Sequence, residues 1–193
     1  MKIEDIKENY YFETLTAEHD LSDFDCGDEE LNNFLKDDAL EQQNANLNVT
    51  KLAICDNNIV GYVSILSDSL IIKNIRDENV SSEIKEKLHI TNNKRTLPAV
   101  KIGRIAIDKK FSGKRLGSHI LRNILLNLKN ISDDEIGFRF IIVEGYAKAF
   151  KFYAVKNQFV NLKKDDDQIK NIDFIAKRDP KKKFYLYFDL ENI

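Results

Sequence analysis

The chain has 193 residues, with 30 lysines and arginines against 32 aspartates and glutamates, a formal net charge of −2, seven glycines and two cysteines. This length suits one domain spanning residues 1–193, and a hydrophobic share of 42% is enough to build a core. The near-neutral charge excludes a polycationic nucleic-acid binder, and two cysteines are too few for the disulfide framework of a small secreted scaffold.

The N-terminal residues Met1–Glu8 contain no apolar segment of the kind found in secretory signals. No stretch of the chain approaches the ~18 uncharged apolar residues that a membrane-spanning helix needs. We therefore expect a soluble, cytoplasmic protein without membrane attachment. In that reducing compartment a disulfide between Cys26 and Cys55 is disfavoured.

The first part of the chain predicts a strand, a helix and a hairpin. Tyr10–Thr16 is aromatic and β-branched, as strands are. Asp28 can cap a helix that has two acidic residues in its first turn. The apolar residues of this helix recur at roughly helical spacing: Leu31, Phe34, Leu35 and Ala39. Val49–Cys55 and Ile59–Leu66 follow as strands, and the turn signal Asp56–Asn58 joins them into a hairpin.

The middle of the chain predicts a short helix, a strand and a long helix. The short helix covers Ser81–Leu88. The helical segment ends by the Leu97–Pro98 pair, because proline pushes the preceding residue out of the helical region. Ala99–Asp108 is the next strand, and Lys114–Leu128 is the clearest helix of the chain. This helix carries one apolar stripe: Leu116, Ile120, Leu121, Ile124, Leu125 and Leu128.

The last part of the chain predicts a strand, a helix and two further strands. Phe138–Val143 is apolar almost throughout, which is typical of a strand buried on both faces. Tyr146–Lys156 is helical, and Ile172–Ala176 and Phe184–Leu190 alternate as strands do. The whole order of elements predicts an α/β layered fold with a mixed sheet.

Three of the seven glycines, Gly103, Gly113 and Gly117, lie in or beside one predicted strand–loop–helix. A helix that begins at such a turn has unpaired N–H groups at the positive end of its dipole, which is where anions bind. Basic residues add to this charge: Lys109, Lys110, Lys114 and Arg115. The loop therefore predicts a phosphate or pyrophosphate site, although its spacing fits neither the P-loop nor the dinucleotide fingerprint. On its own it is better explained as a tight turn with solvated lysines.

The loop residues Ser112–Gly117 resemble motif A of the GNAT superfamily of acetyl-CoA-dependent N-acetyltransferases, whose pattern is Gln/Arg-x-x-Gly-x-Gly/Ala. Gly117 matches the final glycine, whereas Ser112 replaces the Gln/Arg and Arg115 replaces the first glycine. Leu97–Asp108 is similar to the strand that leads into motif A in this family. The departure at Arg115 places a side chain where the backbone usually approaches the pyrophosphate.

The resemblance extends over about residues 20–190. Ala147–Tyr153 resembles motif B, whose helix carries a tyrosine near the thioester sulfur. Phe24–Leu35 and Val60–Ser67 are similar to the subgroup that includes the tRNA-acetylating toxins. The resemblance implies a GNAT-like α/β fold: a mixed, mostly antiparallel sheet, splayed between the strands before and after the helix of the cofactor loop, with helices on both faces.

The resemblance also implies a reaction, the direct attack of a primary amine on acetyl-CoA, the cosubstrate, in a ternary complex. Tyr153 is then the candidate general acid that protonates the leaving thiolate. Glu144 is the first candidate for a base and Asp108 the second, and an α-amino group that titrates near pH ~8 needs none. The residues expected to hold the cosubstrate are Ile105, Ala106, Ile107, Ser112, Gly113, Lys114, Arg115, Leu116, Gly117 and Ser118.

Two alternative functions stay open. The first is a toxin that acetylates aminoacyl-tRNA, which the Phe24–Leu35 match supports and the net charge of −2 disfavours, although Lys181–Lys183 could form a local basic patch. The second is a degenerate GNAT domain that binds acyl-CoA or a partner without catalysis, which the Arg115 substitution suggests. The resemblance makes a homodimer a common form. No cluster in the sequence has metal-ligand spacing, so no metal is expected.

Overall fold

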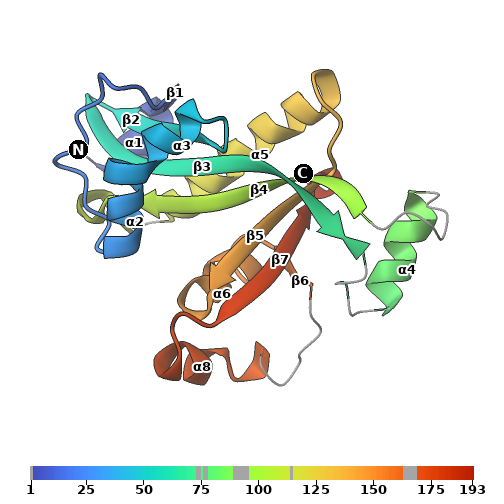
Figure 1. Ribbon diagram of the computed structural model, residues 1–193. Helices are drawn as coiled ribbons and strands as arrows, with labels where there is room; N and C mark the ends of the chain where they lie inside the picture. Colours follow the sequence, from blue (N-terminus) through green and yellow to red (C-terminus); the bar gives the residue numbers. More distant parts are fainter. Residues whose placement is uncertain (1, 73–74, 76–77, 89–95, 114, 163–168) are drawn as a thin grey trace. The chain divides into compact units, whose positions relative to one another are not determined.

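The computed structural model describes residues 2–72, 75, 78–88, 96–113, 115–162 and 169–193. The strands belong to one seven-stranded sheet in the order β1-β2-β3-β4-β5-β7-β6 (Figure 1). The chain divides into two compact units: unit 1 is Met1–Ser67 with Ile102–Asn127, and unit 2 is Asp68–Lys101 with Leu128–Ile193. The single domain over residues 1–193 stays a prediction.

Unit 1 begins at the N-terminus and contains the start of the sheet. Its elements are α1 (Ile3–Asn9), β1 (Tyr11–Thr14), α2 (Glu29–Asn33), a π-helix (Phe34–Asp38), α3 (Ala39–Asn44), β2 (Val49–Cys55), and parts of β3 (Asn58–Ile71), β4 (Thr96–Ile107) and α5 (Leu116–Asp134). β1 and β2 are antiparallel, as are β2 and β3. The Asp28 side chain accepts from the backbone N–H groups of Glu30 and Leu31, which confirms the predicted helix cap.

The β2–β3 hairpin also follows its sequence prediction. Asp56 and Asn57 have φ values of 47° and 60°. A two-residue turn of this kind requires positive φ at both positions, and Asn and Asp tolerate it better than other residues with a side chain. Cys55 and Asn58 therefore pair directly across the turn.

Helices cover both faces of the sheet in unit 1. Successive strand residues point to opposite sides, and apolar residues on each side pack against helices. On one face Phe34 and Leu35 of the π-helix pack in a cluster with Leu52 of β2. On the other face the fully buried Ile6 of α1 and Leu116 of α5 belong to a second cluster, which contains Ala53, Val60 and Ile120.

Unit 2 contains the end of the sheet. Its complete elements are α4 (Glu78–Lys87), β5 (Phe140–Tyr146), a 3-10 turn (Ala147–Ala149), α6 (Phe150–Ala154), β6 (Val160–Asn161), α8 (Ile172–Arg178), β7 (Lys183–Asp189) and a final 3-10 turn (Leu190–Asn192). β5 and β6 both pair with β7 in antiparallel register. Arg139 joins the ends of β5 and β7, because its guanidinium makes two hydrogen bonds of 2.9 Å to Asp189. Such a bidentate pair fixes both side chains.

One predicted element is wrong. Ile172–Ala176, predicted as a strand, lies in helix α8. A short apolar run is ambiguous between the two structures, and charge favours the helix here: Asp173 is in its first turn and Arg178 in its last, each opposite in sign to the nearby end of the dipole. Of the apolar residues only Ile172 is buried, while Phe174 is 63% exposed.

Several elements were not predicted from the sequence, among them α1, the two-residue strand β6 and the π-helix between α2 and α3. The acidic residues Glu4 and Asp5 in the first turn of α1 are a signal that could have found that helix. None of the described helices is both long enough and apolar enough to cross a membrane.

Candidate active site

The candidate cofactor loop connects β4 to α5 in unit 1, and its backbone is unusual at two residues. Gly113 has a φ of +107° and Arg115 a φ of +61°. Arg115 stands where the resemblance expects a glycine, and it adopts the left-handed conformation that glycine favours. For a residue with a side chain this conformation costs about 1–2 kcal/mol. Lys114, the residue between them, lies outside the described residues.

The first turn of α5 is anchored by a buried side chain. Leu116 is 0% exposed, and its N–H donates to the Gly113 carbonyl at 3.0 Å. The His119 N–H donates to the Arg115 carbonyl at 3.0 Å and so closes the first helical turn. Ser112 and Gly113 are exposed, so the loop presents its backbone to solvent while the helix behind it is fixed. A Cβ placed on Gly113 would meet no atom within 4 Å, and this open backbone leaves room for an anion.

The predicted strand residues at the end of β4 lie on alternate faces of the sheet. Ile105 and Ile107 pack against the cluster that contains Leu116, and Ala106 belongs to the cluster on the opposite face. The neighbouring strand β3 approaches closely, because a Cβ on Gly61 would lie 2.7 Å from the Ala106 carbonyl oxygen. Gly61 is therefore needed for the approach of β3 to this strand.

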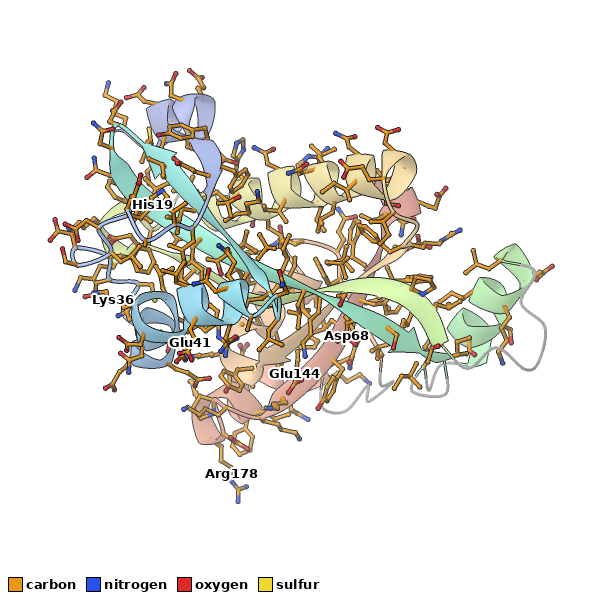
Figure 2. All side chains as sticks on the ribbon, turned by 45° about the horizontal axis from the view of Figure 1, so that its top comes forward. His19, Lys36, Glu41, Asp68, Glu144 and Arg178 are labelled. Carbon is orange, nitrogen blue, oxygen red and sulfur yellow. The ribbon has the colours of Figure 1, made fainter. Side chains whose placement is uncertain are left out.

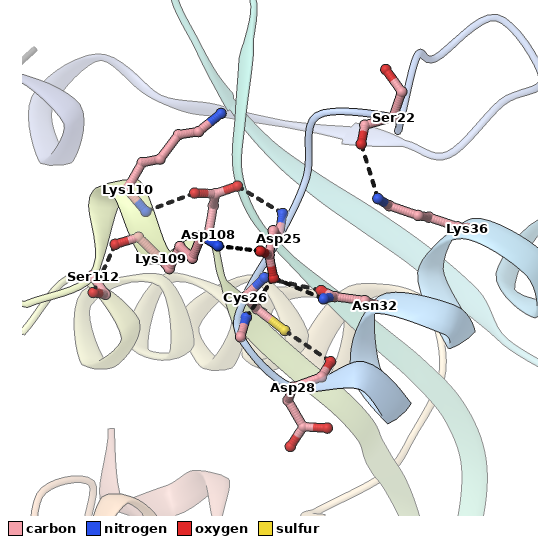
Figure 3. Close-up of polar contacts among 11 residues, drawn as sticks. Ser22, Asp25, Cys26, Asp28, Asn32, Lys36, Asp108, Lys109, Lys110 and Ser112 are labelled. Carbon is pink, nitrogen blue, oxygen red and sulfur yellow. Dashed lines mark hydrogen bonds and ion pairs between the residues drawn. The ribbon is translucent and has the colours of Figure 1, made fainter.

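Asp108, the second candidate base, is held by the backbone of two chain segments. Its side chain is buried and accepts two backbone hydrogen bonds, from Asp25 at 2.9 Å and from Lys110 at 2.7 Å (Figure 3). These bonds use both carboxylate oxygens to hold chain segments together. Sequence reasoning missed this network, because no local signal at Asp108 identifies a partner 83 residues away in the sequence.

Tyr153, the candidate general acid, lies in α6 of unit 2 within an aromatic group. Its ring is 5.0 Å from that of Phe152 and 5.5 Å from that of Phe159, between centroids. Gly145 leaves space for this ring, since a Cβ at that position would lie 3.3 Å from two of the ring carbons. Burial raises the pKa of the Tyr153 phenol well above its usual range, so the hydroxyl keeps its proton and remains a donor at neutral pH.

Glu144, the first candidate base, lies on β5 in unit 2 between two ammonium groups. Its carboxylate oxygens are 2.5 Å from the Lys183 Nζ and 3.2 Å from the Lys101 Nζ. The hydrogen bond from Lys183, aided by Lys101, lowers the pKa of Glu144 and outweighs the opposing effect of burial. The residue lines a cavity of about 150 Å³ together with Asp68 and Tyr185, and Figure 2 labels Glu144 and Asp68.

The predicted site residues thus fall into two groups. The loop and strand residues belong to unit 1, and Tyr153 and Glu144 belong to unit 2. Among the described residues no group of histidine, cysteine and acidic side chains could hold a metal ion. Cys26 and Cys55 are both free thiols.

Comparison with known proteins gives a fold but no matching family model. A tyrosine-to-phenylalanine mutant of KacT matches with a TM-score of 0.74 and 18% identity, over 95% of this chain and 96% of that one. AtaT complexed with acetyl-methionyl-tRNAfMet matches with a TM-score of 0.73 and 20% identity, over 95% and 96%. AtaTR bound with acetyl-CoA matches with a TM-score of 0.66 and 21% identity, over 96% of each chain. The chain therefore has a GNAT-like fold, as the sequence resemblance implied.

Proposed function

We propose that this chain is an N-acetyltransferase that moves an acetyl group from acetyl-CoA to a primary amine. The observation that carries the proposal is the backbone of the loop before α5, where Gly113 and Arg115 are both left-handed. Glycine-rich turns at a helix start bind phosphates because they expose N–H groups at the positive end of the dipole. The GNAT-like fold supports the same assignment.

The residues of unit 1 fit acetyl-CoA as a substrate. The open, exposed backbone at Ser112 and Gly113, followed by the first turn of α5 with Gly117 and Ser118, would bind the diphosphate. The remaining loop residues proposed here are Lys114, Arg115 and Leu116. The backbone amides of β4, at Ile105, Ala106 and Ile107, would bind the arm that ends in the thioester.

In the proposed reaction the neutral amine attacks the acetyl carbonyl, and the C–S bond breaks. The departing thiolate takes the proton of the Tyr153 hydroxyl, and the new amide loses its extra proton to solvent. Burial raises the pKa of the phenol, so the hydroxyl is protonated at neutral pH and available as a donor to the departing thiolate. The phenolate then recovers its proton from water.

A dedicated base is not required by this scheme. Both oxygens of Glu144 are held by lysine ammonium groups, and its lowered pKa makes it a weaker proton acceptor than a free carboxylate. We therefore propose that the amine is neutral because of its own pKa, as an α-amino group near pH ~8 is. Glu144 then serves to hold Lys101 and Lys183.

The second candidate is acetylation of the α-amine of an aminoacyl-tRNA. The likeness to the AtaT complex with acetyl-methionyl-tRNAfMet favours this acceptor, and an aminoacyl group offers an amine of the required pKa. The net charge of −2 argues against a large polyanion, and Lys183 of the basic run Lys181–Lys183 is already paired with Glu144. The third candidate, a CoA-binding domain without catalysis, rests on Arg115 in the loop.

Thiol release from acetyl-CoA with a panel of amines tests the proposal. The panel contains a polyamine, a peptide with a free N-terminus and an aminoacyl-tRNA, and calorimetric titration with CoA is run in parallel. We expect CoA binding and release of thiol with at least one amine. Binding without release across the panel would favour the non-catalytic domain, and release with the aminoacyl-tRNA alone would favour the second candidate. Absence of CoA binding would overturn the proposed function.

A further inference from the structure

The segment Phe24–Leu35 has no part in the acetyl transfer proposed above. In the structure its start lies against the end of β4, at the place where the cofactor loop begins (Figure 3). Asp25 contacts Asp108 and Lys109 there, and Asn32 supports Asp25. We refer to these four residues together as the Asp25–Asp108 clamp. All of them belong to unit 1.

The backbones of the two segments are joined in both directions. The Asp25 N–H donates to the Asp108 carboxylate at 2.9 Å, and the Asp25 carbonyl accepts from the Lys109 N–H at 2.8 Å. The second Asp108 oxygen accepts from the Lys110 N–H at 2.7 Å and caps the 3-10 turn Lys109–Phe111. Only 2% of Asp108 is exposed, so the carboxylate that accepts the two charge-assisted bonds is itself largely shielded from water.

The Asp25 carboxylate forms the second part of the clamp. One oxygen accepts from the Gly27 N–H at 2.8 Å and from the Asn32 side-chain amide at 2.9 Å, and the other is paired with the Lys109 ammonium. The Lys109 contact and these hydrogen bonds lower the pKa of Asp25, so the carboxylate stays ionised at neutral pH. The Asn32 oxygen in turn accepts from the Cys26 N–H at 2.9 Å, so α2 is tied to the same point.

The clamp fixes the start of the cofactor loop. The 3-10 turn that Asp108 caps leads directly to Ser112, whose hydroxyl donates to the Lys109 carbonyl at 3.0 Å. The end of the loop is fixed by the buried Leu116. The left-handed residues Gly113 and Arg115 therefore lie between two fixed points. Backbone donors stabilise an anion only when they are held in the direction of its oxygens before it binds.

We propose that the Asp25–Asp108 clamp orients the cofactor loop for the diphosphate of acetyl-CoA, with Asp25 and Asp108 as positioning residues that do not touch the substrate. This inference rests on the proposed function, and it gives the Phe24–Leu35 segment a role in that site. The Asp25–Asp108 hydrogen bond joins residues 83 positions apart, so a segment far from the loop in the sequence would control the orientation of the loop.

The substitution Asp108→Asn tests the clamp. The amide nitrogen of asparagine is a donor and would face one of the two backbone N–H groups, so one hydrogen bond would be lost. We expect the Kd for CoA and the KM for acetyl-CoA to rise about 10-fold, the effect of losing a hydrogen bond to a charged group, while kcat changes less than about 2-fold. The kcat/KM for S-acetylpantetheine, which has no diphosphate, should change much less. Asp133→Asn removes an exposed carboxylate paired with Lys129 on α5 and is the matched control.

A second variant, Asp25→Ala, keeps the test decisive if Asp108→Asn does not fold. The Asp25 side chain is 38% exposed, so its removal leaves no large cavity, and the backbone hydrogen bonds of residue 25 remain possible. Circular dichroism and thermal melting establish folding of both variants. CoA binding equal to the wild type in the folded variants would overturn the clamp, as would equal losses for acetyl-CoA and S-acetylpantetheine. A wild-type chain that binds no CoA would instead overturn the proposed function beneath it.

Discussion

The cofactor loop and the surroundings of Tyr153 are held by opposite means. The loop begins at Asp108, a buried carboxylate that accepts two backbone hydrogen bonds. Tyr153 is held by aromatic rings, and burial is the only cause of its raised pKa. Hydrogen bonds are directional and fix where a backbone points, whereas apolar packing excludes water and keeps a phenol neutral. Each means of support suits the task proposed for its region.

Each region also needs a glycine, for a different reason. Gly113 is required for its conformation, since its φ of +107° strains any other residue while the space around it is open. Gly145 is required for its size, since a Cβ would press on the Tyr153 ring at 3.3 Å. Substitutions at these positions should therefore separate substrate binding from chemistry.

The largest effect is expected for Tyr153→Phe. Removing the hydroxyl takes away the proposed proton donor, so kcat should fall at least ~10-fold. The ring and its contacts with Phe152 and Phe159 remain, and CoA affinity should stay within about 2-fold of the wild type. Steady-state kinetics and calorimetry measure the two quantities. Unchanged turnover would show that Tyr153 is not the proton donor and that its aromatic surroundings have no role in catalysis.

An intermediate effect is expected for the matched pair Gly113→Ala and Gly145→Ala. At Gly113 the strain of about 1–3 kcal/mol should shift the loop and raise the Kd for CoA several-fold with little change in kcat. At Gly145 the added methyl should displace the Tyr153 ring and lower kcat with little change in Kd. The same assays apply to both. If the two variants give the same pattern, the proposed separation of binding from chemistry fails.

The smallest effect is expected for Arg115→Gly. The change relieves left-handed strain of about 1–2 kcal/mol but gives the unfolded chain extra freedom worth about 0.4–1 kcal/mol. The net gain in the free energy of unfolding should therefore lie between about 0 and 1.6 kcal/mol, measured by urea denaturation. CoA affinity should hold or rise if the backbone of this residue binds the diphosphate. A marked loss of affinity would mean that the guanidinium itself is a ligand.

Local signals explain which elements were predictable. The β2–β3 hairpin followed from Asp56 and Asn57, which tolerate the required φ, and the helix at Asp28 followed from its cap. α8 was mistaken for a strand because the short run Ile172–Ala176 fits both periods. The charges at its two ends favour the helix, and the structure buries Ile172 while it leaves Phe174 exposed. The π-helix Phe34–Asp38 has no local signal that distinguishes it from an ordinary helix.

The candidate site divides in the same way. The sequence by itself indicated the loop before α5, because glycine beside a helix start allows the left-handed backbone of a tight turn, a preference that depends on near neighbours alone. The tertiary structure decided what the acidic residues do: Asp108 meets Asp25 from 83 positions away, and Glu144 meets Lys101 and Lys183 from neighbouring strands. Backbone preferences depend on adjacent residues, but the partners of a carboxylate depend on which distant segments the sheet brings together.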